Sequence, residues 1–176
     1  MLGKVTLVTG GARSGKSRYA LELASEAQNP VFVATASVMD KEMELRVAKH
    51  QEERLGRFVT LEEQTDLAGV FSRLPSGTGV VLVDCLTLWL NNLLYYNGEQ
   101  PEYPEVTALL RLLESPPCPV ILVSNELGLG IVPENPLARF FRDLSGWVNQ
   151  AVAARAELAV LMVSGLPLAL KGRLPG

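Results

Sequence analysis

The sequence predicts an α/β fold: a single phosphate-loop NTPase-type domain with a mostly parallel sheet, helices on both faces and an antiparallel edge strand. Short apolar runs alternate with helical patterns along the chain, as in parallel sheets that helices cover on both sides. The first run, residues 4–9, leads directly into a glycine-rich loop and then into an apolar helical pattern. A chain of 176 residues is long enough for one substantial core, so we expect residues 1–176 to form one domain.

The predicted strands are continuous apolar runs, which are typical of strands buried on both faces of a sheet. They span residues 4–9, 31–35, 80–84, 119–124 and 158–163, with a weaker candidate at 58–61. Residues 166–170 follow the turn-forming pair Ser164-Gly165. We expect them to fold back and pair antiparallel at an edge of the sheet.

Apolar residues at helical spacing predict helices over residues 16–27, 40–54, 65–73, 86–96, 105–114 and 136–156. Asp40 is a plausible cap for the second of these helices. The last is the clearest, because Asn135 is a good N-cap and Pro136 suits the first helical position. The glycine and proline clusters at 75–79 and 115–119 predict loops and not domain linkers.

The composition is that of a globular protein, with 48% hydrophobic and 20% charged residues. A net charge of −3 argues against nucleic-acid binding, which normally needs a basic surface. No apolar run reaches the roughly 18 residues of a membrane span, and a strand and a loop stand where a signal peptide would be. Cys85 and Cys118 lie beside apolar runs. We therefore expect buried, reduced thiols in a cytoplasmic protein.

Residues 10–17 fill every fixed position of the phosphate-binding motif G-x-x-x-x-G-K-S/T. The glycines let several backbone N–H groups point at one phosphate chain. The lysine adds a positive charge for the outer phosphates, the serine offers a hydroxyl to magnesium, and the following helix N-terminus favours an anion. The predicted phosphate cradle is Gly10, Gly11, Ala12, Arg13, Ser14, Gly15, Lys16 and Ser17.

The other candidate residues lie at the carboxyl ends of the predicted strands, where open α/β sheets bind their ligands. Asp84 ends the run VVLVD and matches the acid that holds magnesium in phosphate-loop proteins. We therefore expect Ser17 and Asp84 to hold Mg²⁺. The other strand ends are Ala34, Thr35 and Ala36 in one, and Ser124, Asn125 and Glu126 in another. Glu126 is a candidate general base from its position alone.

His50 is the only histidine in the chain. On a helix, Glu42, Arg46, His50 and Arg54 would form a stripe at four-residue spacing. Two interpretations stay open: a solvated helix face, or a nucleophile or acid–base group near the phosphates. In the second, a neutral imidazole nitrogen attacks phosphorus, and Arg46 or Arg54 stabilises the charge that develops.

Two further features have two interpretations each. Glu62 and Glu63 form either a polar loop or a carboxylate site for a base or ribose. Residues 124–143 place glycines and prolines between a strand end and a helix, which is typical of a substrate lid. In that helix, Arg139 and Arg142 either meet a phosphate or form a surface ion pair with Asp143.

Four blocks of the sequence resemble one family. GGARSGKSRYA, ATASVMDKEMELRVAKHQEER, VDCLTLWLNNLL and VSNELGLGIVPENPLARFFRDLSGWVNQ are similar, in this order, to the bifunctional adenosylcobinamide kinase / adenosylcobinamide-phosphate guanylyltransferases of cobalamin biosynthesis. The resemblance runs from the first strand to the last helix. The third and fourth blocks are specific, because generic phosphate-loop kinases lack them.

The resemblance implies two reactions. ATP or GTP phosphorylates the aminopropanol hydroxyl of adenosylcobinamide, and GTP then gives GMP to that phosphate through a guanylylated histidine. It implies that His50 is the nucleophile and that the protein is a homotrimer with a corrinoid substrate. From the motif itself, we expect Lys16, which screens the phosphate charge, to be the second catalytic residue. The implied nucleotide contacts are Gly10 to Ser17, Ala34, Thr35, Ala36, Gln51, Glu52, Glu53, Arg54, Glu62 and Asp84.

Two other functions remain open from the residues themselves. One is a simple small-molecule kinase in which His50 takes no part, and the other is a non-catalytic switch driven by GTP. Label from the α-phosphate of GTP on the protein separates the family's chemistry from both. The sequence leaves open the nucleotide preferred for phosphorylation, whether kinase activity is kept, and which residues bind the corrinoid.

Overall fold

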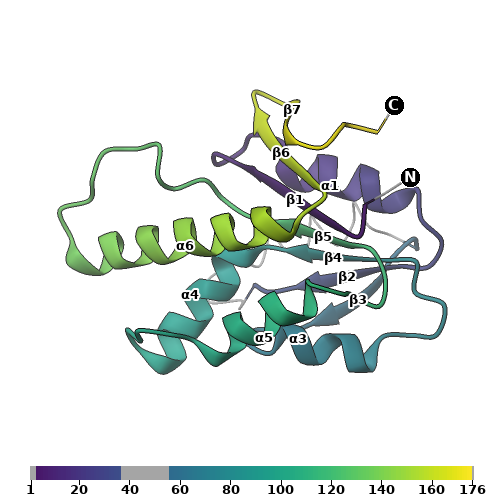
Figure 1. The fold of residues 1–176 in the computed structure, drawn as a ribbon, viewed down its shortest axis with the longest axis horizontal. Coiled ribbons are helices and arrows are strands. Elements are labelled where there is room, and N and C mark those ends of the chain that lie inside the picture. The colour runs from purple at the N-terminus through teal and green to yellow at the C-terminus, as the bar shows by residue number, and fades with distance from the viewer. Residues whose placement is uncertain (1–2, 37–55, 176) are drawn as a thin grey trace.

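A seven-stranded sheet forms the centre of the computed structural model, which describes residues 3–36 and 56–175 (Figure 1). The strand order is β3-β2-β4-β5-β1-β6-β7. The strands pair in parallel except β7, which is antiparallel to β6. This confirms the predicted fold class, including the antiparallel edge strand. The strands are β1 (Val5–Gly10), β2 (Pro30–Ala34), β3 (Val59–Glu62), β4 (Val80–Asp84), β5 (Val120–Val123), β6 (Leu158–Val163) and β7 (Leu166–Lys171).

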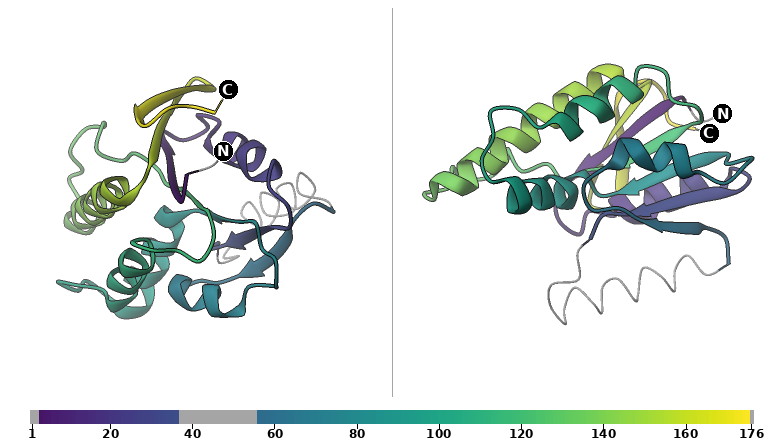
Figure 2. Two further views of the ribbon diagram at one scale, coloured as in Figure 1. Left: turned by 45° about the vertical axis from the view of Figure 1, so that its right-hand side comes forward. Right: turned by 90° about the horizontal axis from the view of Figure 1, so that it is seen from below.

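The described helices cover both faces of the sheet (Figure 2). One face packs against α1 (Lys16–Ser25). The other packs against α3 (Leu67–Val70), α4 (Leu86–Asn97), α5 (Pro104–Leu112) and α6 (Pro136–Arg155). The predicted helix over residues 40–54 lies outside the described residues.

The helix predicted over residues 65–73 is wrong in its extent. The α-helix is only α3, and a 3₁₀ turn over Phe71–Arg73 follows it. Asp66 ends the helix on its N-terminal side, because its side chain accepts a hydrogen bond from the Gly69 N–H. Thr65 is held outside the helix by Trp89, whose indole Nε1 donates to the Thr65 carbonyl over 2.6 Å.

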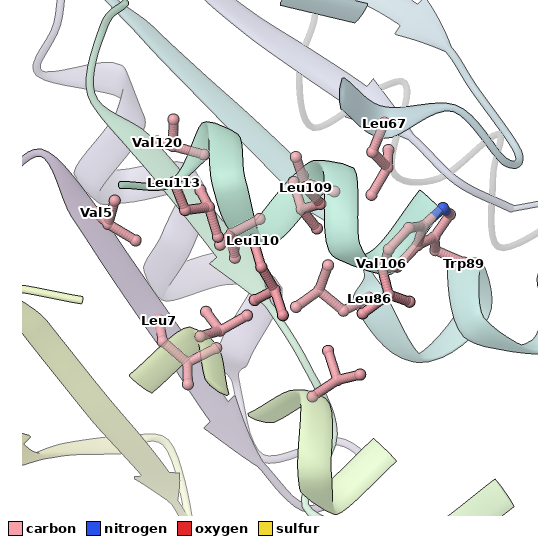
Figure 3. Packing of buried hydrophobic residues seen from close by; sticks show 14 of the residues in the cluster. Val5, Leu7, Leu67, Leu86, Trp89, Val106, Leu109, Leu110, Leu113 and Val120 are labelled. Carbon is pink, nitrogen blue, oxygen red and sulfur yellow. The ribbon is translucent and has the colours of Figure 1, made fainter. Parts of the chain in front are cut away.

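The larger hydrophobic cluster lies between the sheet and α3 to α6 (Figure 3). Side chains from β1, β5, α4 and α5 meet there, and Trp89 is fully buried among them. A second cluster lies under α1 and includes Ala20, Leu23 and Ala24. Because both faces are covered, the central strands have no solvent-facing side, which explains why they appear in the sequence as unbroken apolar runs.

Helix α6 begins as the sequence predicts. The Asn135 side chain accepts a hydrogen bond from the Ala138 N–H over 3.2 Å, and Pro136 occupies the first turn. The segment from β5 to this cap arches outward over the end of α6 (Figure 1). It begins at the same edge of the sheet as the loop that follows β1.

Both cysteines are free thiols, as expected. Cys85 is buried, whereas Cys118 is only partly buried, so the expectation of burial is right for Cys85 alone. Within residues 3–36 and 56–175, no helix has the length and apolar character needed to cross a membrane.

The two tryptophans give a test of the core. We expect Trp89→Phe to lower the free energy of unfolding by about 1–3 kcal/mol, because it loses buried volume and leaves the Thr65 carbonyl without its donor. The matched control is Trp147→Phe, because Trp147 is 54% exposed on α6. We expect it to change stability by less than about 0.5 kcal/mol. Urea denaturation measures both, and equal losses in the two variants would contradict the buried hydrogen bond.

Candidate functional site

The carboxyl ends of β2, β3 and β4 lie side by side. The parallel register pairs Ala34 with Glu62 on one side and with Asp84 on the other. Beyond these pairs, the Thr35 N–H donates to the Asp84 carbonyl over 3.4 Å, and the Glu63 N–H donates to the Ala34 carbonyl over 3.0 Å. Three groups of residues predicted from separate parts of the sequence therefore meet at one edge of the sheet.

The phosphate loop lies at the same edge, between the end of β1 and the start of α1. Gly10 has φ +150°, and a Cβ there would lie 2.5 Å from the Met162 carbonyl oxygen and 2.8 Å from Ser14 Oγ. No larger residue fits, because one of these contacts is with the backbone of β6. Gly15 has φ +96° and caps α1 in the left-handed conformation. The fold therefore requires glycine at Gly10 and Gly15, the same two positions at which the motif requires it.

Lys16 is folded back onto the loop. Its ammonium donates to the Gly11 carbonyl over 2.6 Å, and the residue is only 7% exposed. Burial lowers the pKa of Lys16, although nearby Cys85 and Asp84 raise it. The ammonium therefore stands beside the loop with one backbone partner, and a phosphate in the loop would offer it a stronger, charged acceptor.

Two neighbouring segments brace the phosphate loop through its backbone. The Glu126 N–H, just past β5, donates to the Gly10 carbonyl over 3.0 Å. The Gly165 N–H, in the turn between β6 and β7, donates to the Ser14 carbonyl over 3.0 Å. The sequence predicted the turn at Gly165 but gave no signal that it touches the loop, because the contact depends on the pairing of β1 with β6.

Asp84 and Ser17 fit the chemistry of a magnesium site. Asp84 is half-buried at the end of β4, and its charge acts on Lys16. Ser17 is partly exposed in the first turn of α1. Among the described residues, no three His, Cys, Asp or Glu side chains form a metal cluster. A magnesium ion here would therefore depend on nucleotide phosphates and water for its remaining ligands, as Mg²⁺ commonly does.

Cys85 follows Asp84 and is not a reactive thiol. Burial, and secondly the nearby charge of Asp84, raise the pKa of Cys85 to about 12. The nucleophilic thiolate is therefore almost absent near neutral pH. Cys85 also holds Thr35, because its N–H donates to Thr35 Oγ1 over 2.8 Å and its carbonyl accepts from the same hydroxyl over 2.8 Å.

The two glutamates after β3 have different roles. Glu63 is structural: its carboxylate accepts from the N–H groups of Thr65 and Asp66 and from Arg73, at 2.7–3.0 Å. These hydrogen bonds and the charge of Arg73 lower the pKa of Glu63 in spite of its partial burial. Glu62, by contrast, is exposed at the end of β3. Of the pair, only Glu62 is placed to meet a ligand.

The arginines of α6 have local partners. Arg142 pairs with Asp143 at 2.8 Å, which is the surface ion pair that the sequence left open. Arg139 donates to the carbonyls of Pro133 and Glu134 at 2.9 and 2.6 Å. It therefore stabilises the end of the loop that was predicted to be a lid. Within that loop, Leu129 and Ile131 are 83% and 97% exposed.

His50 and the neighbouring Gln51, Glu52, Glu53 and Arg54 lie outside the described residues, as do Glu42 and Arg46. The described chain reaches Ala36 on one side of this segment and resumes at Gly56 on the other. Their predicted roles therefore stay predictions.

Comparison with known proteins gives close relatives. Residues 6–170 match the family model described as "Cobinamide kinase / cobinamide phosphate guanyltransferase". The bifunctional adenosylcobalamin biosynthesis protein CobP of Pseudomonas aeruginosa is 47% identical over 94% of this chain and 96% of its own length. The corresponding CobU proteins of Escherichia coli and Salmonella typhimurium are each 39% identical over 94% of this chain and 98% of their own length.

A solved structure supports the fold. An ATPase from the type III secretion system of pathogenic bacteria superposes with a TM-score of 0.53 at 14% identity. The match covers 91% of this chain and 51% of that one. At this identity the likeness concerns the arrangement of strands and helices alone.

The phosphate loop gives the second prediction. We expect Lys16→Ala to weaken the binding of nucleoside triphosphate by roughly 10- to 100-fold, because the loop loses its buried cation. Calorimetry on folded protein measures the affinity. The control is Lys4→Ala, because Lys4 is exposed at the opposite end of β1. Unchanged affinity in a folded Lys16→Ala variant would show that the loop does not hold the phosphates.

Proposed function

Since this chain belongs to the cobinamide kinase / cobinamide phosphate guanyltransferase family, we propose that its phosphate loop serves both of the reactions in the family's name. The supporting observation is that the family match spans residues 6–170 while the loop, Asp84 and Glu62 lie at one edge of the sheet. One loop of this kind is described, so the two reactions would use it in turn with different acceptors.

The first reaction is phosphorylation of adenosylcobinamide. The aminopropanol hydroxyl attacks the γ-phosphorus of ATP or GTP, the bond to the β-phosphate oxygen breaks, and the nucleoside diphosphate leaves. Residues Gly10 to Ser17 hold the phosphate chain, and Lys16 moves from the Gly11 carbonyl to the outer phosphates. Positioning and charge provide the catalysis, so this step needs no protein nucleophile.

The second reaction transfers GMP from GTP to the phosphorylated corrinoid. A nitrogen of His50 attacks the α-phosphorus, pyrophosphate leaves, and a phosphorus–nitrogen bond joins GMP to the protein. A phosphate oxygen of the corrinoid then attacks the same phosphorus and releases His50. Splitting the transfer in two lets one site serve two bulky partners in succession. The nucleotide would also contact Ala34 to Ala36, Gln51 to Arg54, and Glu62.

Mg²⁺ would be held by Ser17 and Asp84 together with phosphate oxygens, where its charge offsets that of the triphosphate. Glu126 is the candidate general base for the kinase step. Its N–H bonds to Gly10, and its carboxylate accepts from the Gly128 N–H over 3.2 Å. It therefore lies beside the phosphate loop.

We also propose that residues 1–176 form one domain and that three copies assemble in the cytoplasm. The continuous seven-stranded sheet supports the single domain.

The trimer rests on the resemblance and on an exposed apolar row at the β7 edge. This row consists of Val163, Leu166, Leu168 and Leu170, which are 53–71% exposed. Apolar rows of this kind are commonly covered by a partner.

The proposed trimer can be tested by measuring the mass of the assembled protein in solution. We expect light scattering at micromolar concentration to give three times the chain mass of 19.1 kDa. Replacing Leu168 by Lys should lower that mass, because it puts a charge into the proposed contact. Replacing Lys4 by Glu at the far end of β1 is the control. A monomeric mass for the unmodified protein would contradict the trimer.

His50 separates the two reactions. We expect His50→Ala to form no protein–GMP adduct from α-labelled GTP and to transfer no GMP, while a measurable part of corrinoid phosphorylation remains. The adduct of the unmodified protein should be labile in acid and stable in alkali, as a phosphorus–nitrogen bond is. Gel electrophoresis of labelled protein and chromatography of the corrinoid products measure the two reactions.

Lys49→Ala is the matched control, because it removes the adjacent amine. We expect this variant to keep the adduct. Adduct formation in His50→Ala would place the nucleophile elsewhere, on Lys49 or Lys16. Loss of both reactions in a folded variant that still binds GTP would mean that His50 serves the whole pocket and not the covalent step alone.

A further inference from the structure

Asn92 is a buried polar residue in the apolar stretch of α4. It is 5% exposed, and its neighbours in the sequence are the fully buried Leu93 and the exposed Asn91. A carboxamide has two N–H groups, and here each reaches a different backbone carbonyl. Asn92 Nδ2 donates to the Thr35 carbonyl over 2.8 Å and to the Gln64 carbonyl over 3.1 Å.

The two carbonyls belong to the ends of different strands. Thr35 directly follows β2, and Gln64 lies two residues after β3. The last backbone hydrogen bond between these strands runs from the Glu63 N–H to the Ala34 carbonyl. One residue further along each of these segments, the carboxamide of Asn92 connects the Thr35 and Gln64 carbonyls. The hydrogen bond to Thr35 is buried, so water does not compete for that carbonyl, whereas the one to Gln64 is partly buried.

The surroundings keep these strand ends in place from several sides. The Thr35 hydroxyl is locked to Cys85 at the end of β4. Trp89, one turn before Asn92 on the same helix, donates to the carbonyl of Thr65. Helix α4 therefore holds the segments after β2 and β3 through two side chains three residues apart. The hydrogen bonds that these side chains make to Thr35, Gln64 and Thr65 are all to backbone carbonyls.

We propose that Asn92 is a positioning residue for the guanylyl step, an inference that rests on the proposed function. Thr35 lies between Ala34 and Ala36, and Gln64 lies two residues after Glu62. We assign Ala34, Ala36 and Glu62 to the nucleotide. By fixing both strand ends at once, Asn92 sets where Thr35 and Ala36 lie relative to Glu62, and so where the nucleoside end of GTP presents its α-phosphorus.

The phosphate loop has separate supports. It is braced by the Glu126 N–H, from the segment just past β5, and by the Gly165 N–H, from the β6–β7 turn. Neither brace involves Asn92 or the ends of β2 and β3. Loss of the Asn92 donors should therefore disturb attack on the α-phosphorus more than it disturbs the grip on the phosphates.

The test compares Asn92→Asp with Asn91→Asp. The first keeps the shape of the buried side chain but removes its N–H groups, and the second makes the same change on the exposed neighbour. We expect the rate of adduct formation from α-labelled GTP to fall about tenfold or more in Asn92→Asp. Phosphorylation of cobinamide should change far less, and affinity for GTP should fall by a smaller factor than the adduct rate, because the phosphate loop keeps its own braces. Asn91→Asp should resemble the unmodified protein in all three measurements.

A pH series adds a readout specific to the hydrogen bonds. A carboxyl group buried against two carbonyls has a raised pKa, and its protonated form regains one donor. The deficit of Asn92→Asp relative to Asn91→Asp should therefore shrink as the pH falls. If Asn92→Asp does not fold, as judged by circular dichroism, Asn92→Ser and Asn91→Ser are compared by the same three measurements.

Two results would overturn the inference. One is an adduct rate in the folded Asn92 variant that equals its Asn91 control. The other is an equal fall of adduct rate, phosphorylation and GTP affinity, which would indicate general damage. Hydrogen exchange gives an answer independent of the reaction: the Glu63 amide should exchange faster in the Asn92 variant, and equal exchange also overturns the inference. Absence of any adduct in the unmodified protein would instead refute the proposed function.

Discussion

The site depends on how closely the backbone of β6 approaches the end of β1. At Gly10 there is room for a hydrogen but not for a methyl group, since the Met162 carbonyl oxygen occupies that space. This contact lets the loop curl over the sheet edge and start α1 at Lys16. The same approach brings the turn after β6 to the Ser14 carbonyl. The phosphate loop is therefore shaped by its neighbours as much as by its own glycines.

The other strand ends are held by polar side chains beneath them. In α4, Thr87 Oγ1 accepts from the Asn125 N–H over 2.9 Å, and Asn92 binds the carbonyls of Thr35 and Gln64. From α6, Asn149 donates to the Asn125 carbonyl over 3.0 Å. Buried hydrogen bonds of this kind fix backbone positions where the strand ladder has ended. This edge of the sheet is thus organised by side chains from the covered side of the sheet.

The charged residues at this edge of the sheet do not all have the same role. Glu62 stands at the surface, whereas Glu63 beside it is used entirely for local structure. Likewise Arg139 and Arg142 stabilise the loop and helix that contain them. Charged residues that looked equivalent in the sequence therefore differ: Glu62 is exposed at the sheet edge, whereas Glu63, Arg139 and Arg142 have structural partners. A charged side chain has a structural role here where a backbone group or an opposite charge lies within hydrogen-bonding distance of it.

The sequence by itself determined the order of strands and helices in the described chain, the phosphate loop and the Asn135 cap. These depend on residues close together in the chain, and their periodicity and spacing are visible without the fold. The tertiary structure alone decided that α3 starts at Leu67 and that Glu63 is structural. It also decided what Asn92 holds. The Thr35 carbonyl lies 57 positions from Asn92. Spacing along the chain contains no information about such a contact, because packing of α4 beneath the sheet creates it.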